Sequence, residues 1–215
     1  MATTVKTKRP YNTTLRDQHA QMTRARILDA ARSLLAAGTY SSVTMADIAK
    51  EAGVAYQTVY GIFGTKVHLA EALIQVGFSH VPPAMKLFES LRDLSEPEQA
   101  FRTAAHATRL ILEPCADLVR FIRGSGDPGL LAGYHAREQT RYTAIVKSGL
   151  IEKLRKSGRL RANLKPSEAV AAIWAMSGAD LYNQLVFERG WTADRYEEWI
   201  ADTLMTIVLE AKRRK

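Results

Sequence analysis

Residues 44–69 read TMADIAKEAGVAYQTVYGIFGTKVHL, and this stretch contains two short helical segments separated by one glycine. Thr44 and Asp47 have the spacing of a capping box, which predicts a helix that begins at Thr44. Gly53 ends this helix, because the left-handed position after a helix favours glycine, and a second helix is expected over residues 55–62. Two short helices joined by a tight turn form a helix-turn-helix, which places the amino end of its second helix in the major groove of DNA.

The same stretch resembles the DNA-binding motif of the TetR family of bacterial transcriptional repressors. The resemblance rests on a long first helix followed by Thr44, Ile48, Ala49, Ala52, Gly53, Val54, Thr58, Val59, Tyr60, Phe63, Lys66 and Leu69. A weaker similarity to the last helices of many members covers Glu188–Trp191, Tyr196, Trp199 and Leu204. The resemblance implies a homodimeric repressor that binds a pseudo-palindromic operator and is released by a small-molecule effector. Activation of transcription is the alternative within the family.

The residues expected to contact DNA are Arg24, Thr44, Tyr56, Gln57, Thr58, Tyr60 and Lys66. Polar side chains at the start of the second helix can reach base edges, and Gln57 can pair with adenine N6 and N7. The resemblance assigns Lys66 a phosphate contact, Tyr60 can donate a hydrogen bond to a phosphate, and Thr44 can present a helix amino end to one. The alternatives are solvated side chains, a Tyr60 ring that only packs, and a Thr44 that only caps its helix. Gly61 stands where many members have a bulky or basic residue, so a contact is expected to be lost there.

Composition and charge agree with a DNA-binding protein that has no secretory or membrane segment. The chain has 215 residues, 47% of them hydrophobic, and a net charge of +8. Residues 1–70 hold nine Lys and Arg against four Asp and Glu, so the basic excess is concentrated in the first third. The chain shows no apolar signal region and no run of about 20 apolar residues. Cys115 is the single cysteine, which excludes an internal disulfide and suits a reducing cytoplasm.

Apolar residues recur with helical spacing from residue 18 onward, which predicts an all-α protein. We expect a basic flexible arm over 1–17, a three-helix helix-turn-helix domain over 18–70, and a helical effector-binding and dimerisation domain over 71–215. The expected helices span residues 18–37, 44–52, 55–62, 66–80, 84–93, 96–112, 115–123, 134–157, 166–189 and 194–213. Pro82 and Pro83 are expected to break the chain after the fourth helix, and residues 124–129 are expected to form a loop.

The last two predicted helices suit a dimer interface of two helices from each subunit. The final helix carries one continuous apolar stripe, and the preceding helix is apolar nearly all round. The residues assigned to this interface are Val170, Gly178, Trp199, Leu204, Ile207 and Val208. The alternative is that these helices are buried inside a monomer.

The effector is expected to bind among the central helices, a role that the resemblance implies and that the sequence only permits. The candidate residues are Phe101, His106, Arg109, Phe121, Tyr142 and Trp174. Arg109 points to an anionic effector, although a solvated arginine explains it equally well, and aromatic residues at helical spacing also suit a core. The histidines lack metal-ligand spacing, and we expect neither a metal nor a cofactor.

Two other classes of protein compete with this interpretation. Cys115 could act as the nucleophile of an enzyme, but the sequence offers it no partner base, and a small buried side chain explains it better. No nucleotide-binding loop, zinc-protease motif or serine elbow is present. A basic helical protein can also bind a membrane surface, yet the basic excess lies in the helix-turn-helix region and the arm. We therefore expect a DNA-binding regulator and no enzyme.

Overall fold

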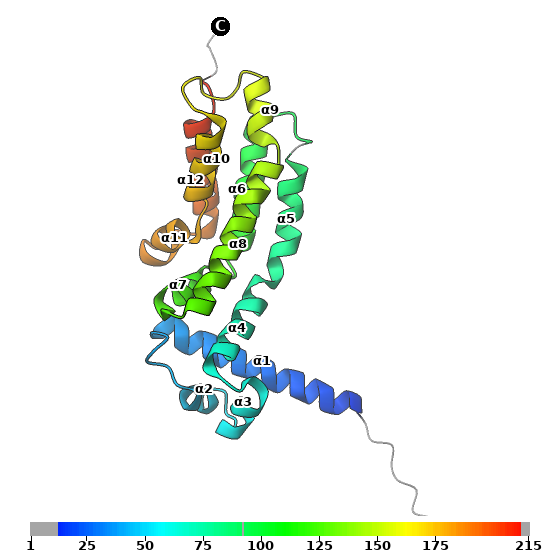
Figure 1. The fold of residues 1–215 in the computed structure, drawn as a ribbon, viewed down its shortest axis with the longest axis vertical. Coiled ribbons are helices and arrows are strands. Elements are labelled where there is room, and N and C mark those ends of the chain that lie inside the picture. The colour runs from blue at the N-terminus through cyan, green and yellow to red at the C-terminus, as the bar shows by residue number, and fades with distance from the viewer. Residues whose placement is uncertain (1–12, 92, 212–215) are drawn as a thin grey trace, which may run out of the picture.

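The computed structural model describes residues 13–91 and 93–211, and the described chain is helical (Figure 1). The all-α prediction, with an amino-terminal helix-turn-helix domain and a helical second domain, is confirmed. In chain order the helices are α1 (Thr13–Ala37), α2 (Met45–Glu51), α3 (Tyr56–Phe63), α4 (Lys66–Gly77), the 3-10 helix η1 (Phe78–His80), α5 (Val81–Ser90), α6 (Pro97–Leu112), α7 (Ala116–Ser125), α8 (Pro128–Lys147), α9 (Leu150–Lys156), α10 (Pro166–Met176), α11 (Ala179–Tyr182), the π-helix η2 (Asn183–Glu188) and α12 (Ala193–Val208).

Helices α1–α4 form a small unit at the lower end of the molecule (Figure 1). Ile27 of α1, Ile48 of α2 and Val59 of α3 are fully buried, and Leu69 of α4 is 1% exposed. Helices α2 and α4 pack on α1, and α3 packs on α2 and α4, so tertiary packing, and not intrinsic helix propensity, holds these short helices in place. The predicted bounds of α2 and α3 agree with the structure to within one residue at each end.

Helices α5–α12 form an elongated bundle above this unit (Figure 1). Helix α6 packs between α5 and α12, and α8 packs against α10. Phe101 of α6, together with Tyr196 and Leu204 of α12, is at most 2% exposed. The core of the bundle therefore lies along α6, and α8 and α10 close it on one side.

Helix α4 runs from the lower unit into the bundle, and its last residue lies directly against α7. A Cβ atom placed on Gly77 would be 2.1 Å from Leu118 Cδ1 and 3.9 Å from Cys115 Cβ. Glycine thus allows the backbone of α4 to approach α7 more closely than any other residue would. This contact joins α4, which starts beside α3, to α7, which starts after α6.

The first and last predicted helices differ from the structure at their ends. Helix α1 begins at Thr13, so the end of the predicted arm is helical, whereas residues 1–12 lie outside the described part of the chain. Helix α12 ends at Val208, because Leu209 becomes extended and pairs with Leu160 in an isolated antiparallel bridge.

The chain is interrupted after the fourth helix, as predicted, but the interruption is η1, and Pro82 and Pro83 follow it instead of forming it. Both lie in the first turn of α5, where the missing backbone N–H of proline costs no hydrogen bond. The predicted loop over 124–129 is wrong in extent, since only Gly126 and Asp127 separate α7 from α8. The carboxylate of Asp127 accepts a hydrogen bond from Leu130 N at 2.9 Å, which starts α8 earlier than predicted.

The two long helices predicted over 134–157 and 166–189 are each interrupted. Gly149 has a φ of 69°, a left-handed conformation that ends the run of α8 and starts α9. Gly178 is extended and separates α10 from α11. Among the described helices, none combines the length and the apolar character that crossing a bilayer requires.

We expect Gly77→Ala to lower the free energy of unfolding by about 1 kcal/mol, because overpacking against buried Leu118 outweighs the gain in helix propensity. Gly61→Ala is the matched control: Gly61 is also helical, but its Cβ would meet open space, so this change should raise stability by up to about 1 kcal/mol. Urea unfolding of both variants measures the difference. Equal shifts of the two variants would contradict the close approach of α4 to α7.

Candidate DNA interface and ligand cavity

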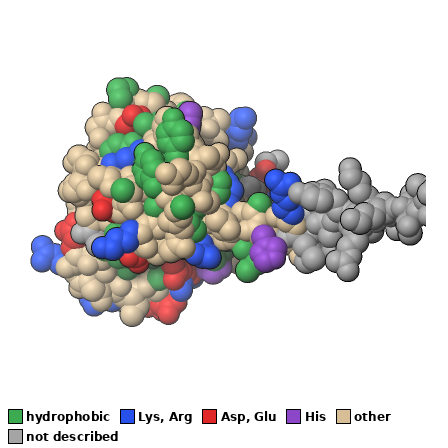
Figure 2. Space-filling model, turned by 90° about the horizontal axis from the view of Figure 1, so that it is seen from below, with side chains coloured by type: hydrophobic (Ala, Val, Ile, Leu, Met, Phe, Trp, Pro, Cys, Tyr) green, Lys and Arg blue, Asp and Glu red, His purple; other side chains and the backbone are tan. Residues whose placement is uncertain are grey.

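The amino end of α3 is free of capping side chains and projects from the lower end of the molecule. Its N-cap is Ala55, which makes no side-chain hydrogen bond to the helix. Tyr56 and Tyr60 are 48% and 58% exposed, their rings stack with centroids 6.3 Å apart, and Gln57 beside them is exposed. Figure 2 views this end and shows apolar side chains gathered near its centre, with Lys and Arg side chains around them. The aromatic, amide and hydroxyl groups exposed at this end can contact base edges in the major groove of DNA.

Thr44 caps α2 as the sequence predicts. Its hydroxyl accepts a hydrogen bond from Asp47 N at 3.1 Å and donates one to the Asp47 carboxylate, which also accepts from Thr44 N at 2.9 Å. These hydrogen bonds lower the pKa of Asp47, so the carboxylate is ionised and itself occupies this helix end. A phosphate contact of Thr44 stays a prediction.

Lys66 holds the loop before α2 to the start of α4. Its ammonium group donates a hydrogen bond to the carbonyl oxygen of Tyr40 and lies 4.2 Å from the centroid of the Tyr40 ring. Burial lowers the pKa of this amine. An ammonium carries three donors, so a phosphate can be bound by the donors that Tyr40 leaves unused, and the phosphate role stays a prediction.

Two arginines of α1 contact the helix-turn-helix from behind. Arg24 lies 5.2 Å from the ring centroid of Phe63, at the carboxyl end of α3. Arg26 donates to the carbonyl oxygens of Ala52 and Gly53, at 2.5 and 3.3 Å, and so satisfies the carboxyl end of α2. Sequence analysis missed Arg26, because its partners lie 26 and 27 positions along the chain and no local pattern marks the contact.

A clamp centred on Arg32 joins the lower unit to the bundle. The guanidinium of Arg32 donates two hydrogen bonds of 2.8 Å to the carboxylate of Asp117 and one of 2.6 Å to the carbonyl oxygen of Pro114. The bond to Asp117 raises the pKa of Arg32. Beside the clamp, the rings of Tyr40 and Phe121 lie 5.3 Å apart. Phe121, a predicted effector residue, thus belongs to the contact between the two units.

A cavity of about 300 Å³ lies directly behind this clamp. Helices α6 and α7 contribute Leu112, Cys115 and Val119, and Phe78 closes it next to the end of α4; the other residues on its walls are Met85, Ile111, Tyr134, Arg137, Glu138, Thr140, Arg141 and Ala179. Its wall is mostly apolar, with a few polar groups from α8, as is usual for small-molecule sites. The turn that carries Pro114 therefore contacts Arg32 on one side and carries part of the cavity wall on the other.

Further cavities adjoin the first. One of about 370 Å³ lies between α5 and α8 and shares Met85 and Thr140 with it. Another of about 440 Å³ lies beside α8 and α10, shares Tyr134 and Arg141 with the first cavity, and includes Trp174 among its lining residues. Trp174, a predicted effector residue, thus lines this cavity of about 440 Å³. The rings of Trp174 and Tyr142, another predicted effector residue, meet edge to face with centroids 6.1 Å apart.

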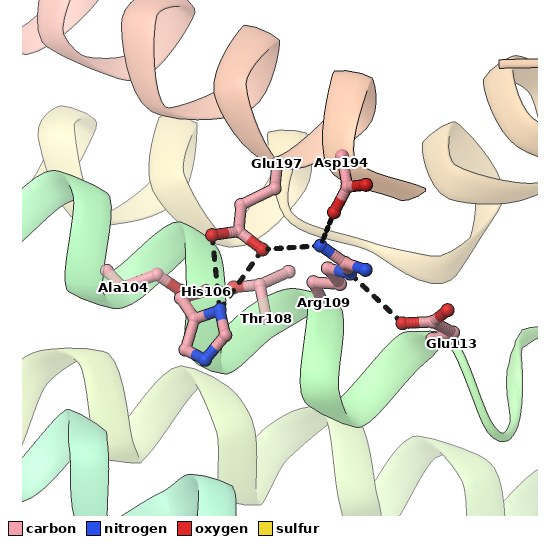
Figure 3. A network of polar contacts seen from close by, with 7 residues as sticks. All are labelled: Ala104, His106, Thr108, Arg109, Glu113, Asp194 and Glu197. Atoms are coloured by element: carbon pink, nitrogen blue, oxygen red, sulfur yellow. Dashed lines mark hydrogen bonds and ion pairs between the residues drawn. The ribbon is translucent and has the colours of Figure 1, made fainter. Parts of the chain in front are cut away.

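The other predicted effector residues have different surroundings. Phe101 is 1% exposed and borders a void of about 20 Å³, which is too small for an effector. His106 and Arg109 lie in an ion-pair network between α6 and α12 (Figure 3). The geometry therefore assigns Phe101 to the core, and His106 and Arg109 to a contact between helices.

Arg109 is the centre of that network. Its guanidinium donates to Glu113 at 3.0 Å, to Glu197 at 3.2 Å and to Asp194, and His106 Nδ1 lies 3.1 Å from the same Glu197 carboxylate (Figure 3). These bonds raise the pKa of Arg109. The cation that sequence analysis associated with an anionic effector is thus already surrounded by carboxylates of its own chain.

The cavity residues of α8 were missed by sequence analysis. Tyr134, Arg137, Glu138 and Arg141 follow one another at helical spacing, which is a signal for a shared face of α8. What this face meets is set by η1, α5, α6, α7 and α11, which come from other parts of the sequence to line the same cavity. The pattern alone therefore predicts a solvated polar face as readily as a cavity wall.

The residues predicted for a dimer interface divide into two groups. Leu204 and Val208 are at most 2% exposed and lie in the core of their own subunit, where α12 packs on α6, so their placement on an outer surface was wrong. Val170 is likewise buried, at 7% exposure. The remaining predicted residues, Gly178, Trp199 and Ile207, are partly exposed. Two further small apolar residues of α10, Ala171 and Ala175, are exposed beside them.

The surroundings of Cys115 do not favour its use as the nucleophile of an enzyme. Burial raises the pKa of its thiol to about 12, so the nucleophilic thiolate is scarce at neutral pH. The thiol donates to the carbonyl oxygen of Ile111. Within the described ranges, His, Cys, Asp and Glu side chains form no cluster able to hold a metal ion.

These features define a class of protein, a helical protein that presents a helix-turn-helix at one end and a half-open pocket behind it. Residues 27–73 match the family described as bacterial regulatory proteins, tetR family. Over 45 residues the chain is 42% identical to the HTH-type transcriptional regulator AlkX of Mycobacterium tuberculosis, and the match covers 21% of each protein. The matched segment thus spans about a fifth of that relative.

Solved structures extend the likeness in fold to most of the chain. NalD of Pseudomonas aeruginosa, the secondary repressor of a multidrug efflux pump, has a TM-score of 0.64 at 20% identity, over 90% of this chain and 98% of that one. FadR of Bacillus subtilis in complex with stearoyl-CoA has a TM-score of 0.63 at 16% identity, over 85% and 98%. SmeT, the repressor of a Stenotrophomonas maltophilia efflux pump, has a TM-score of 0.59 at 18% identity, over 90% and 93%. Residues 27–73 thus form a DNA-binding segment of the TetR family, and over most of its length the chain has the fold of these solved structures.

The Arg32 clamp makes a testable contribution to stability. In a double-mutant cycle of Arg32→Gln and Asp117→Asn, we expect a coupling free energy of about 1 kcal/mol, reduced from that of a buried pair because Arg32 is 38% exposed. The coupling should fall in high salt. Urea unfolding measures it, and the exposed pair of Arg155 and Glu152 within α9 serves as the control with a smaller coupling. Strictly additive effects of the two substitutions would show that Arg32 and Asp117 have no coupling free energy.

Proposed function

We propose that this protein is a homodimeric transcriptional repressor that binds a pseudo-palindromic operator and is released by a small-molecule effector. The observation that carries the proposal is the physical continuity between the two sites. Helix α4 starts beside α3 and ends at Gly77, immediately before Phe78 on the cavity wall. A ligand that favours one arrangement of the cavity can therefore tilt α4 and change the separation of the two recognition helices in a dimer.

The proposal keeps the predicted domain organisation. Residues 18–70 serve DNA binding and residues 71–215 serve effector binding and dimerisation, with the basic segment 1–17 at the amino end. Arg24, Thr44, Tyr56, Gln57, Thr58, Tyr60 and Lys66 are the proposed DNA contacts. The basic charge of residues 1–70 supports attraction to DNA, and the proposed binding to an operator goes with a cytoplasmic location.

The cavity behind the Arg32 clamp is the proposed effector site. Its volume of about 300 Å³ and its apolar wall suit a small organic molecule. A coupling of about 1–3 kcal/mol between effector and operator would lower DNA affinity about 5–150-fold, and linkage requires that the operator weaken effector binding by the same factor. An activator in which the effector strengthens DNA binding is the second candidate, and the sign of this coupling separates the two.

The decisive experiment is selection of bound duplexes from a random DNA pool by the purified protein. A repressor of this type should enrich a pseudo-palindrome whose half-sites lie about one helical turn apart or a multiple of it. Failure to enrich any sequence, with binding only to the duplex backbone, would rule out operator recognition. The enriched operator then serves the experiments below.

Lys66→Ala should weaken binding to every DNA sequence, and the slope of log affinity against log salt should fall by about one unit per subunit, because one phosphate contact is lost. Gln57→Ala should instead change the preference at one base position of each half-site by about 1–3 kcal/mol. Fluorescence anisotropy with labelled duplexes measures both effects. Lys156→Ala is the matched control, since Lys156 is 71% exposed on α9, far from α3.

Circular dichroism of Lys66→Ala must accompany the binding data, because Lys66 also holds the Tyr40 carbonyl. An unchanged salt slope in a folded Lys66→Ala variant would contradict the phosphate contact. A changed sequence preference in that variant would assign Lys66 to base recognition.

The dimer is proposed to form through the exposed apolar face of α10 and the partly exposed residues of α12. Ala171→Glu places a charge on this face without disturbing the core, because Ala171 is exposed in the subunit. We expect this variant to be a folded monomer by light scattering, with much weaker operator binding because two half-sites are no longer bound together. Val146→Glu, on an exposed position of α8, should remain dimeric. A dimeric Ala171→Glu protein would place the interface elsewhere.

A further inference from the structure

Among the charged groups on the wall of the cavity behind the Arg32 clamp, Glu138 and Arg141 neutralise each other. Arg141 donates to the Glu138 carboxylate at 2.7 and 3.3 Å, to Ser177 Oγ at 2.8 Å and to the carbonyl oxygen of Trp174 at 2.9 Å. Its guanidinium also lies 5.7 Å from the centroid of the Trp174 ring. Arg141 is thus fixed and satisfied, and the pair adds no net charge to the cavity.

Arg137 is the other cation on this wall, and its position differs from that of Arg141. It is partly buried, and its guanidinium lies 5.0 Å from the centroid of the Phe78 ring. Among the residues that the structure describes, no carboxylate lies within ion-pair distance of Arg137. The cavity therefore carries one uncompensated positive charge, which is costly in apolar surroundings and attracts an anion.

The remaining residues of the wall determine how polar the body of the ligand can be. Met85, Ile111, Leu112 and Val119 present aliphatic groups to the cavity. Burial raises the pKa of Tyr134 to about 12, so its phenol adds no charge at neutral pH. The complementary molecule is apolar over most of its surface and has one anionic group at an end.

We propose that the effector is an apolar monoanion, with a carboxylate or an equivalent group that pairs with Arg137. The proposal rests on the effector-responsive function proposed above and names the chemical class that the cavity takes. It also names the moving part. An anion that draws the guanidinium from the Phe78 ring alters a contact of the residue that directly follows α4, and α4 leads to the recognition helix.

The test uses matched probes that share a hydrocarbon body and differ in charge. Decanoate, decan-1-ol and decylamine form one set, and 4-phenylbutyrate, 4-phenylbutan-1-ol and 4-phenylbutylamine form a second. Dissociation constants are measured by isothermal titration calorimetry on the full-length protein without DNA. In at least one set, the carboxylate should bind about tenfold or more tightly than the alcohol, because hydrogen bonds to charged groups are the stronger ones.

Substitutions of Arg137 locate the preference. Arg137→Gln should bring the affinities of the carboxylate and the alcohol together, mainly by weakening carboxylate binding, and measurable alcohol binding by this variant shows that the cavity is intact. Arg137→Lys should retain part of the preference. Arg155→Gln is the control, because Arg155 is exposed on α9 and paired with Glu152. Equal affinity of carboxylate and alcohol in the native protein, a preference that survives Arg137→Gln, or no binding of any probe would each overturn the proposal.

A second measurement separates this proposal from the proposed function. The preferred carboxylate is added to the complex of the protein with its selected operator, and anisotropy follows release. Arg137-dependent binding of the carboxylate without release of the operator would support the anion site and contradict the proposed effector-controlled repressor. If the protein binds its operator but shows no preference for the anion, the proposed anion site is contradicted and the proposed regulatory function is not.

Discussion

The contact of Arg32 with Asp117 and Pro114 sets the geometry on which the rest of the molecule depends. Arg32 lies on α1, the helix on which α2 and α4 pack, while Pro114 and Asp117 lie where α6 turns into α7. A partly exposed ion pair contributes little to overall stability. Its planar, bidentate form nevertheless fixes the direction of one unit relative to the other.

The turn after α6 has two neighbours at once. Pro114 accepts a hydrogen bond from the DNA-binding unit, and Leu112 and Cys115 on either side of it line the cavity. Gly77 and Leu118 provide a second connection a short distance away, through α4. Packed interiors do not deform continuously, so under the proposed function a change on the cavity wall would be transmitted as a shift of whole helices. The two connections leave α1 and α4 as the elements through which such a shift reaches α3.

Local signals made the helix-turn-helix predictable. The capping box of Thr44 and the positive φ of Gly53 depend on residues a few positions apart, and the sequence contains both signals. Long-range packing was not predictable in the same way. Arg109 and Arg137 are both arginines on polar faces of helices, yet Arg109 meets carboxylates 85 and 88 positions away while Arg137 faces a cavity. The apolar stripe of α12 was recognised, but only the packing of α6 shows that Leu204 faces the interior of its own subunit.

The π-helix η2 has a consequence for how this part of the chain tolerates changes in length. A π-turn takes in one residue more than an α-turn, so it is equivalent to a one-residue insertion in an α-helix. Asn183 anchors its start by donating to the carbonyl oxygen of Ala116 at 3.0 Å, and Phe187 near its end is 49% exposed. Deleting one residue between them would restore α-helical winding and leave the following side chains on the same face of the helix, because the π-turn absorbs its extra residue locally. We therefore expect a one-residue deletion to be tolerated in this segment while the contact of Asn183 with α7 stays in place.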